Sequence, residues 1–297
     1  MHPHRVFRQP TLLIVGCGDI GLRVIECLGP FWKVLALTSS PGRCEELRHA
    51  GAKPLVGNLD DPATLGRLAG LADAVLHLAP PPGAGSSDTR TRALLSALRR
   101  GTRVRRLVYA STTGVYGDCG GAWVDETRAV RPLTDRAGRR CDAEARVRHF
   151  GRGTGCVATV LRVPGIYASN RPGGDPRERL RRGMPALCAE DDVFTNHIHA
   201  DDLARACIAA LMRGKPQRVV HAVDDSDLRM GEYFDLAADL TGLPRPPRIS
   251  RVQAQEMLSP MAMSFMSESR RLRNQRLKRE LRVTLRYPTV REGLQHG

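Results

Sequence analysis

The stretch Thr11–Leu28, TLLIVGCGDIGLRVIECL, limits the possible folds of this chain more than any other part of it. An aliphatic run leads directly into Gly16, Gly18 and Gly21, and an amphipathic segment follows. A GxGxxG spacing between a strand and a helix is typical of the first unit of a dinucleotide-binding fold. Gly16 permits a tight turn, Gly18 permits close approach of a pyrophosphate, and Gly21 permits close packing of helix against strand. We therefore expect the cofactor to meet Gly16, Gly18, Asp19, Ile20 and Gly21; a glycine turn of purely structural origin is the alternative.

The rest of the chain alternates strand-like and helix-like segments, which predicts an α/β fold. We expect a Rossmann-type, doubly wound parallel sheet with a smaller C-terminal substrate lobe. Residues 1–165 would form the NAD(P)-binding domain, to which residues 195–225 return. Residues 166–194 and 226–297 would form the substrate-binding lobe.

The residues after the second expected strand, Lys33–Leu37, bear on the choice of cofactor. In the dinucleotide-binding pattern an acidic residue here holds the ribose hydroxyls of NAD. This chain has Thr38, Ser39 and Ser40 instead, and Arg43 follows them. Small hydroxyls with an arginine suit a 2′-phosphate, so Ser39 and Arg43 favour NADP over NAD. An Arg43 that only covers a solvated helix face is the alternative.

Two further strand ends are expected to meet the cofactor. Asn58 and Leu59 follow the third strand and would lie near the adenine. Leu78 and Ala79, where the fourth strand ends in a proline-rich loop, would flank the nicotinamide.

The composition disfavours several classes of protein. No apolar run is long enough to cross a membrane and the first ten residues lack the apolar core of a signal peptide, so we expect a cytoplasmic location. The eight cysteines show no CxxC pair and no metal-ligand spacing, which predicts free thiols and no metal. The net charge of +15 could mark a nucleic-acid partner, but the basic residues are spread widely and aromatic residues are scarce. Nucleic acid and membrane are therefore disfavoured as partners.

Several motifs occur in order along nearly the whole chain: GCGDIG near the start, YASTTGVYGD at 109–118, LRVPGIY at 161–167 and NHIHADDLA at 196–204. Together they resemble the extended short-chain dehydrogenase/reductase superfamily, in its epimerase/dehydratase branch. The resemblance implies an NAD(P)-dependent enzyme that acts on a small molecule. It also implies that protomers can form a homodimer through the long helices expected near 88–99 and 134–150.

The resemblance breaks down at the catalytic helix, where the superfamily carries YxxxK. Counted back from Ala143 and Glu144, which resemble the residues that close that helix, the tyrosine position is Arg136 and the lysine position is Arg140. Arginine stays protonated near neutral pH and cannot shuttle a proton. The chain is in this respect similar to the atypical, YeeZ-like members, which lack the active-site tyrosine. Arg140 could still bind a phosphate or the ribose, or it could lie on a solvated helix face.

Few other groups are candidates for chemistry. Thr112 matches the position where the superfamily places a hydroxyl that bonds the reacting oxygen; an ordinary strand-end hydroxyl is the alternative. Tyr116 is disfavoured as a replacement acid, because the ring of that motif usually packs. Asp118 would serve as a base only if burial raised its pKa, and a capping role is favoured.

A basic segment in the expected lobe, SNRPGGDPRERLRR at 169–182, offers Arg177, Arg181 and Arg182 as a clamp for an anionic substrate, or as a solvated helix. We expect an epimerase/dehydratase-like oxidoreductase that acts on a sugar-like or other hydroxyl or carbonyl substrate, with Thr112 orienting the reacting oxygen. A non-catalytic, NAD(P)-sensing regulatory protein is the alternative. An RNA-associated protein that binds through the basic run 270–282 is a third hypothesis.

Overall fold

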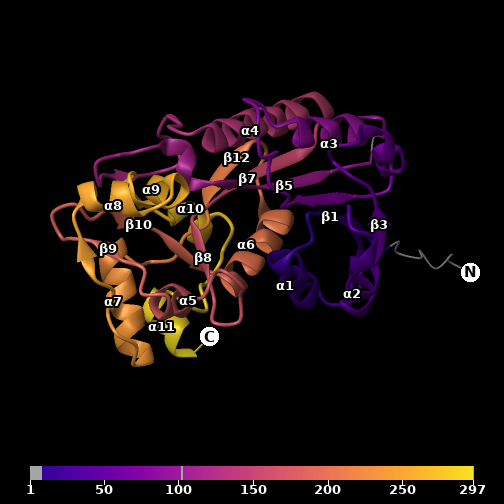
Figure 1. Ribbon diagram of the computed structural model, residues 1–297. Coiled ribbons are helices and arrows are strands. Elements are labelled where there is room, and N and C mark those ends of the chain that lie inside the picture. Colours follow the sequence, from indigo (N-terminus) through magenta and orange to yellow (C-terminus); the bar gives the residue numbers. More distant parts are fainter. Residues whose placement is uncertain (1–8, 102, 297) are drawn as a thin grey trace, which may run out of the picture. The chain divides into compact units, whose positions relative to one another are not determined.

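A computed structural model describes residues 9–101 and 103–296, and its centre is a seven-stranded sheet (Figure 1). The strand order is β12-β7-β5-β4-β1-β2-β3, and the pairs β2–β3, β1–β2, β1–β4 and β4–β5 are parallel. The strands are β1 (Thr11–Val15), β2 (Lys33–Thr38), β3 (Lys53–Val56), β4 (Ala74–His77), β5 (Arg106–Thr112), β7 (Val157–Val163) and β12 (Arg218–His221). The chain runs from β1 to β2 on one side and reaches β4 on the other, so the order reverses between β1 and β4. This is the expected doubly wound Rossmann-type sheet.

The chain divides into two compact units. Unit 1 comprises residues 1–110, 142–160 and 207–218, and unit 2 comprises residues 111–141, 161–206 and 219–297. Each unit is described by itself below.

In unit 1, helices cover both faces of the sheet (Figure 1). Helices α1 (Asp19–Leu28) and α2 (Cys44–His49) lie on one face, and α3 (Thr89–Arg99) lies on the other with the C-terminal part of α4 (Asp135–Thr154). Every residue of β1 is buried, which explains why the strand is a continuous apolar run instead of an alternating one. Helix α1 turns Ile20, Val24 and Ile25 inward.

Helix α4 is longer than its sequence pattern suggests. The expected span was 134–150, and the helix extends to Thr154, after which Gly155 adopts a φ of +70°. At the other end the Thr134 hydroxyl oxygen accepts a hydrogen bond of 3.2 Å from the Ala137 N–H, which fixes the start of the helix.

Unit 2 is built from short elements around an aromatic core. Tyr167, Tyr233 and Phe234 pack there with Leu180 and Val290. The elements are β6 (Trp123–Val124), β8 (Gly165–Tyr167), α5 (Pro176–Arg181), β9 (Ala186–Leu187), β10 (Phe194–Thr195), β11 (His197–His199), α6 (Ala200–Arg213, whose last turns belong to unit 1), β13 (Leu228–Arg229), α7 (Met230–Thr241), β14 (Arg248–Ile249), α8 (Arg251–Met257), α9 (Pro260–Met266), β15 (Arg271–Leu272), α10 (Gln275–Arg279) and α11 (Val290–His296). The strands pair two by two, as β8–β11, β9–β14, β10–β13 and β6–β15.

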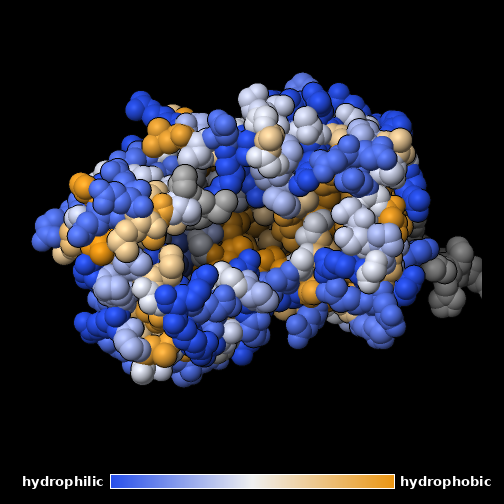
Figure 2. All heavy atoms as spheres, viewed as in Figure 1, coloured by the Kyte–Doolittle hydropathy of each residue, from blue (hydrophilic) through white to orange (hydrophobic). Residues whose placement is uncertain are grey.

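Hydrophilic residues cover most of the surface seen in Figure 2, in keeping with a charged-residue content of 26%. Among the described residues, no helix has both the length and the apolar composition that crossing a membrane requires. The eight cysteines are all free thiols.

Candidate functional site

The three glycines of the first turn each meet a different physical demand. Gly16 has a φ of +81°, and a Cβ there would lie 2.5 Å from the backbone nitrogen of Ala79. A Cβ on Gly21 would lie 2.9 Å from the Cys17 sulfur and 3.3 Å from a methyl group of Ile14, so this glycine allows α1 to pack on β1. A Cβ on Gly18 would meet no described protein atom within 4 Å. Protein packing therefore explains the first and third glycines but not Gly18.

Gly18 is also the N-cap residue of α1, and no side chain caps this helix end. The backbone N–H groups of the first helical turn have no partner inside the helix, and the helix dipole places positive charge there. Asp19 turns sideways and accepts a 3.1 Å bond from Arg23 Nε, while Ile20 points into the core. An uncapped helix end beside an open glycine fits a bound pyrophosphate.

The loop after β4 joins this turn. The backbone N–H groups of Leu78 and Ala79 both donate to the Val15 carbonyl, at 2.8 and 3.0 Å. The ends of β1 and β4 thus meet where the strand order reverses, which is the place where sheets of this type bind ligands.

Arg43 lies across the glycine turn. Its Nη1 donates to the Cys17 carbonyl at 2.8 Å, and its Nε and Nη2 donate to the Glu46 carboxylate at 2.9 and 2.8 Å. The hydrogen bond with Glu46 raises the pKa of Arg43 and lowers that of Glu46. Ser39 is exposed shortly before Arg43 in the chain. One backbone bond thus holds the Arg43 guanidinium at the glycine turn.

The loop after β3 is ordered by its own side chains. The Asn58 side-chain oxygen accepts a 3.0 Å bond from the Asp60 N–H, and Asp60 in turn accepts two bonds from Arg90 at 2.8 and 2.6 Å. Asn58 is exposed and Leu59 is half-buried. Asn58 therefore has a structural role in its loop, and an adenine contact is still a prediction.

In unit 2, Thr112 ends β5 and caps the short 3-10 helix η3 (Thr113–Tyr116). Its hydroxyl oxygen accepts a 3.3 Å bond from the Gly114 N–H. Bonding of this kind uses the oxygen lone pair, so the hydroxyl hydrogen can still be donated to a ligand. On α4, Arg136 is exposed and Arg140 is half-buried.

Tyr116 is a packing residue, as its motif suggested. Its side chain is 1% exposed, its hydroxyl oxygen lies 2.6 Å from His221 Nε2, and Arg162 Nη1 donates to the same oxygen at 2.5 Å. His221 Nδ1 faces the Arg273 carbonyl at 2.9 Å, so Nδ1 carries the hydrogen and Nε2 accepts from Tyr116. Burial lowers the pKa of His221 to about 3, which keeps the ring neutral.

Asp118 joins η3 to the C-terminal segment. Burial alone would raise the pKa of this carboxyl group, but hydrogen bonds from the backbone N–H groups of Ser269, Gly120 and Cys119 hold it below its usual value. The bonds from Ser269 and Gly120 are 2.8 and 3.1 Å long. Asp118 is therefore a structural carboxylate and not a proton acceptor near neutral pH.

Unit 2 contains a cavity of about 350 Å³. Aromatic and apolar side chains line most of it, and Arg179, Arg182 and His197 are its basic lining residues. The remaining lining residues are Gly165, Ile166, Tyr167, Gly173, Gly174, Asp175, Pro176, Glu178, Thr195, Met230, Tyr233, Phe234, Ala262 and Met266.

Two polar atoms of the cavity walls are buried without a hydrogen-bond partner among the described residues: Arg179 Nε and His197 Nδ1. Arg179 stacks on Phe234 with its guanidinium carbon 4.7 Å from the ring centroid, and burial lowers its pKa. Burial also lowers the pKa of His197 to about 3, so its ring is neutral. Unsatisfied buried polar atoms are costly, and a ligand in this cavity could bond them.

Only one arginine of the expected clamp lines this cavity, and one lining arginine was missed. Arg177 pairs with Asp175 at 2.7 Å, and Arg181 is exposed. Arg182 lines the cavity as expected, together with the unexpected Arg179. Four of the six residues from 177 to 182 are arginine, so the sequence pattern offered no means of choosing among them.

A doubly wound sheet with an uncapped glycine turn at its reversal point defines a dinucleotide-binding protein of the α/β class. Comparison with known proteins gives the family. The model of the NAD-dependent epimerase/dehydratase family matches residues 12–222, and the chain belongs to this family.

Individual relatives agree with this assignment. A structure of a functionally unknown conserved protein from Silicibacter pomeroyi superposes with a TM-score of 0.80 at 32% identity, covering 96% of this chain and 97% of the other. UDP-glucose 4-epimerase from Thermotoga maritima, solved with UDP-glucose, superposes with a TM-score of 0.76 at 22% identity, covering 96% of each chain. A ketoreductase of Stigmatella aurantiaca that acts on a farnesylated dihydroquinoline oxide is 23% identical over 247 residues, covering 78% of this chain and 73% of the relative. The names of these similar proteins thus describe both an epimerase and a reductase.

Proposed function

We propose that this protein is an NAD(P)-dependent oxidoreductase of atypical mechanism that acts on a hydroxyl or carbonyl group of an anionic, sugar-like substrate. The observation that supports it best is Gly18, whose position beside an uncapped helix end has no explanation in protein packing. Family membership supports the same conclusion. When bound, the dinucleotide supplies the hydride donor or acceptor.

NADP is the proposed cofactor. Arg43 is tied to the Cys17 carbonyl of the glycine turn and could exchange its Glu46 partner for a 2′-phosphate. No acidic residue occurs between Thr38 and Arg43 to hold the ribose hydroxyls of NAD. Ser39, Asn58, Leu59, Leu78 and Ala79 are proposed as further contacts of the cofactor.

The substrate is proposed to bind in the cavity of unit 2, most of whose lining residues belong to 166–194 and 226–297. Arg179 and Arg182 offer guanidinium groups to an anion, and the aromatic walls suit a ring or an apolar group. Solved relatives bind UDP-glucose or UDP-glucuronic acid with NAD, which makes nucleotide-linked sugars the first probes to use.

Thr112 and Arg140, which match positions of the superfamily's catalytic motifs, are proposed to take part in the reaction. Thr112 would donate its hydroxyl hydrogen to the reacting oxygen, and Arg140 would hold the ribose or a phosphate. Arg140 cannot transfer a proton at neutral pH, so the proton must come from elsewhere.

The test is turnover of NADPH or NADH with a panel of carbonyl compounds that includes nucleotide-linked keto sugars, followed by absorbance. Thr112→Val should lower the rate by at least about tenfold through loss of a hydrogen bond to the reacting oxygen. An unchanged rate removes Thr112 from the chemistry. Tight cofactor binding without any hydride exchange would favour the non-catalytic, NAD(P)-sensing alternative.

Two further properties are proposed. A homodimer through α3 and α4 is supported by a groove of about 430 Å³ between these helices, whose lining residues are Arg92, Leu95, Ser96, Arg99, Ala145, Arg146, His149 and Phe150. Light scattering of the purified protein tests it. A cytoplasmic location is proposed because all eight cysteines are free, as thiols in a reducing compartment are.

A further inference from the structure

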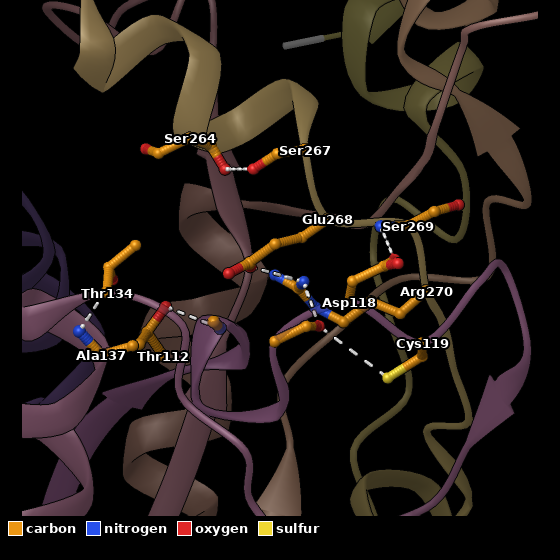
Figure 3. A network of polar contacts seen from close by, with 12 residues as sticks. Thr112, Asp118, Cys119, Thr134, Ala137, Ser264, Ser267, Glu268, Ser269 and Arg270 are labelled. Atoms are coloured by element: carbon orange, nitrogen blue, oxygen red, sulfur yellow. Dashed lines mark hydrogen bonds and ion pairs between the residues drawn. The ribbon is translucent and has the colours of Figure 1, made fainter.

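A carboxylate from the C-terminal segment reaches the turn that carries Thr112. Figure 3 shows the Glu268 side chain extending from the end of α9 toward Thr112. A methyl group on Gly114 would stand 3.7 Å from Thr112 Oγ1 and 3.9 Å from Glu268 Oε2. The hydroxyl and the carboxylate therefore lie near one point, and Gly114 places no side chain between them.

The position of this carboxylate is well determined by its surroundings. Its side chain is 9% exposed, and Arg270 Nη1 donates to Glu268 Oε2 at 2.7 Å and to the Gly117 carbonyl at 3.0 Å. The residue between them, Ser269, donates its N–H to Asp118 at 2.8 Å (Figure 3). Ser269 and Arg270 thus fix the segment to the loop that follows Thr112.

We propose that Glu268 is the proton-transferring residue of this protein and replaces the tyrosine that the family's catalytic helix lacks here. The inference rests on the proposed oxidoreductase function. Both side-chain oxygens lie within 4 Å of the position that a Cβ on residue 114 would take. A substrate oxygen would lie farther from the Gly114 Cα than that position, between the two side chains, and its bonds to them would tighten when ligand binds. Arg136 and Arg140 cannot take this role.

In the oxidising direction the substrate O–H bond breaks and its proton passes to Glu268 Oε2. The hydrogen of the adjacent C–H bond leaves with its electron pair to the oxidised nicotinamide dinucleotide, and a C=O bond forms. In the reducing direction protonated Glu268 returns the proton to the carbonyl oxygen as that carbon receives hydride. Thr112 donates a hydrogen bond to the same oxygen in both directions. Ala262 and Met266 of α9 line the cavity of unit 2, so the helix just before Glu268 also borders the proposed substrate site.

The test uses Glu268→Gln, which keeps the shape of the side chain and removes its basicity, and Glu280→Gln as the matched control. Glu280 is also mostly buried and faces an arginine, Arg276, at 3.9 Å in the same C-terminal segment. With the best carbonyl or alcohol probe of the panel, Glu268→Gln should lower kcat by about 10²- to 10⁴-fold. Affinity for NADPH, measured by calorimetry, and the melting temperature should match those of Glu280→Gln.

Two further variants separate chemistry from folding. Gly114→Ala should fold normally, because its added methyl group makes only contacts of 3.7 Å or longer. It should lower turnover, because the methyl group would restrict the approach of a substrate oxygen to Thr112 and Glu268. In Glu268→Ala, added formate or acetate should restore part of the rate, which loss of a merely structural residue would not allow. If the wild type turns over a probe and Glu268→Gln does so at a similar rate, the role of Glu268 is overturned and the proposed function is not. No turnover by the wild type with any probe overturns the proposed function and this inference with it.

Discussion

Replacing Gly18 with alanine tests whether ligand binding, and not folding, requires glycine at this position. Gly18 has a φ of −89°, which alanine can adopt, and the added Cβ would meet no described protein atom within 4 Å. Alanine is a poorer N-cap residue than glycine by about 0.5–1 kcal/mol. The smaller freedom of the unfolded alanine chain offsets this by about 0.4–1 kcal/mol. We therefore expect the free energy of unfolding to change by less than about 0.5 kcal/mol.

Binding should respond very differently. The methyl group would keep a pyrophosphate away from the first-turn N–H groups of α1, and each charge-assisted hydrogen bond is worth about 1.5–3 kcal/mol. Loss of one such bond corresponds to a decrease of roughly 10- to 150-fold in affinity for NADPH. Calorimetric titration measures the affinity, and urea unfolding measures the stability of the same preparation.

Two other glycines provide the comparison. Gly66 lies in the 3-10 helix Pro62–Leu68, and a Cβ there also meets nothing within 4 Å. Gly66→Ala should therefore leave the affinity unchanged and raise the free energy of unfolding by at most about 1 kcal/mol. Gly16→Ala should instead lower the free energy of unfolding by about 2–5 kcal/mol, because a φ of +81° disfavours alanine and its Cβ would overlap Ala79. Unchanged affinity of Gly18→Ala for both NADPH and NADH would refute the assignment of this turn to a pyrophosphate.

Three other predictions follow from single contacts. Arg43→Ala should weaken NADPH binding by roughly 10- to 100-fold and leave NADH binding unchanged, whereas Arg48→Ala, on the exposed side of the α2 helix that follows Arg43, should affect neither. Equal losses for both cofactors would contradict a 2′-phosphate contact. Tyr116→Phe removes the hydroxyl that bonds buried Arg162 and His221, so urea unfolding should show a free energy of unfolding lower by about 1–3 kcal/mol. The kcat of the folded variant should equal that of the wild type. Loss of kcat without loss of stability would instead indicate that Tyr116 is catalytic. Burial lowers the pKa of His221 from 6.5 to about 3, so the unfolded chain takes up the proton first. The stability contributed by neutral His221 is complete above about pH 6.5 and falls toward pH 3 by up to about 1.4 kcal/mol per pH unit. The free energy of unfolding of His221→Gln should depend less steeply on pH over this range. An equally steep dependence in the variant would assign the slope to other groups.

The fold and the glycine turn after β1 could be predicted from the sequence because their determinants are local. Gly16, Gly18 and Gly21 act within one strand–turn–helix unit, and apolar runs such as Leu12–Val15 show which strands are buried on both faces. The prediction that arginines take the YxxxK positions also rests on local spacing, because Arg136 and Arg140 are counted from neighbouring motif residues on one helix. Boundaries were less accurate where a cap or a glycine ended the element, as at Gly155.

The polar groups that surround the proposed substrate were decided only by tertiary structure. Arg179 was indistinguishable from its neighbours until folding buried it against Phe234 and left Arg181 in solvent. Glu268 lies more than 150 residues from Thr112 and belongs to no motif, so no spacing in the sequence connects them. Residue types and short-range periodicity determine which strands, turns and helices form, but the meeting of distant side chains depends on how those elements pack, and packing is set by many weak contacts that no local pattern records.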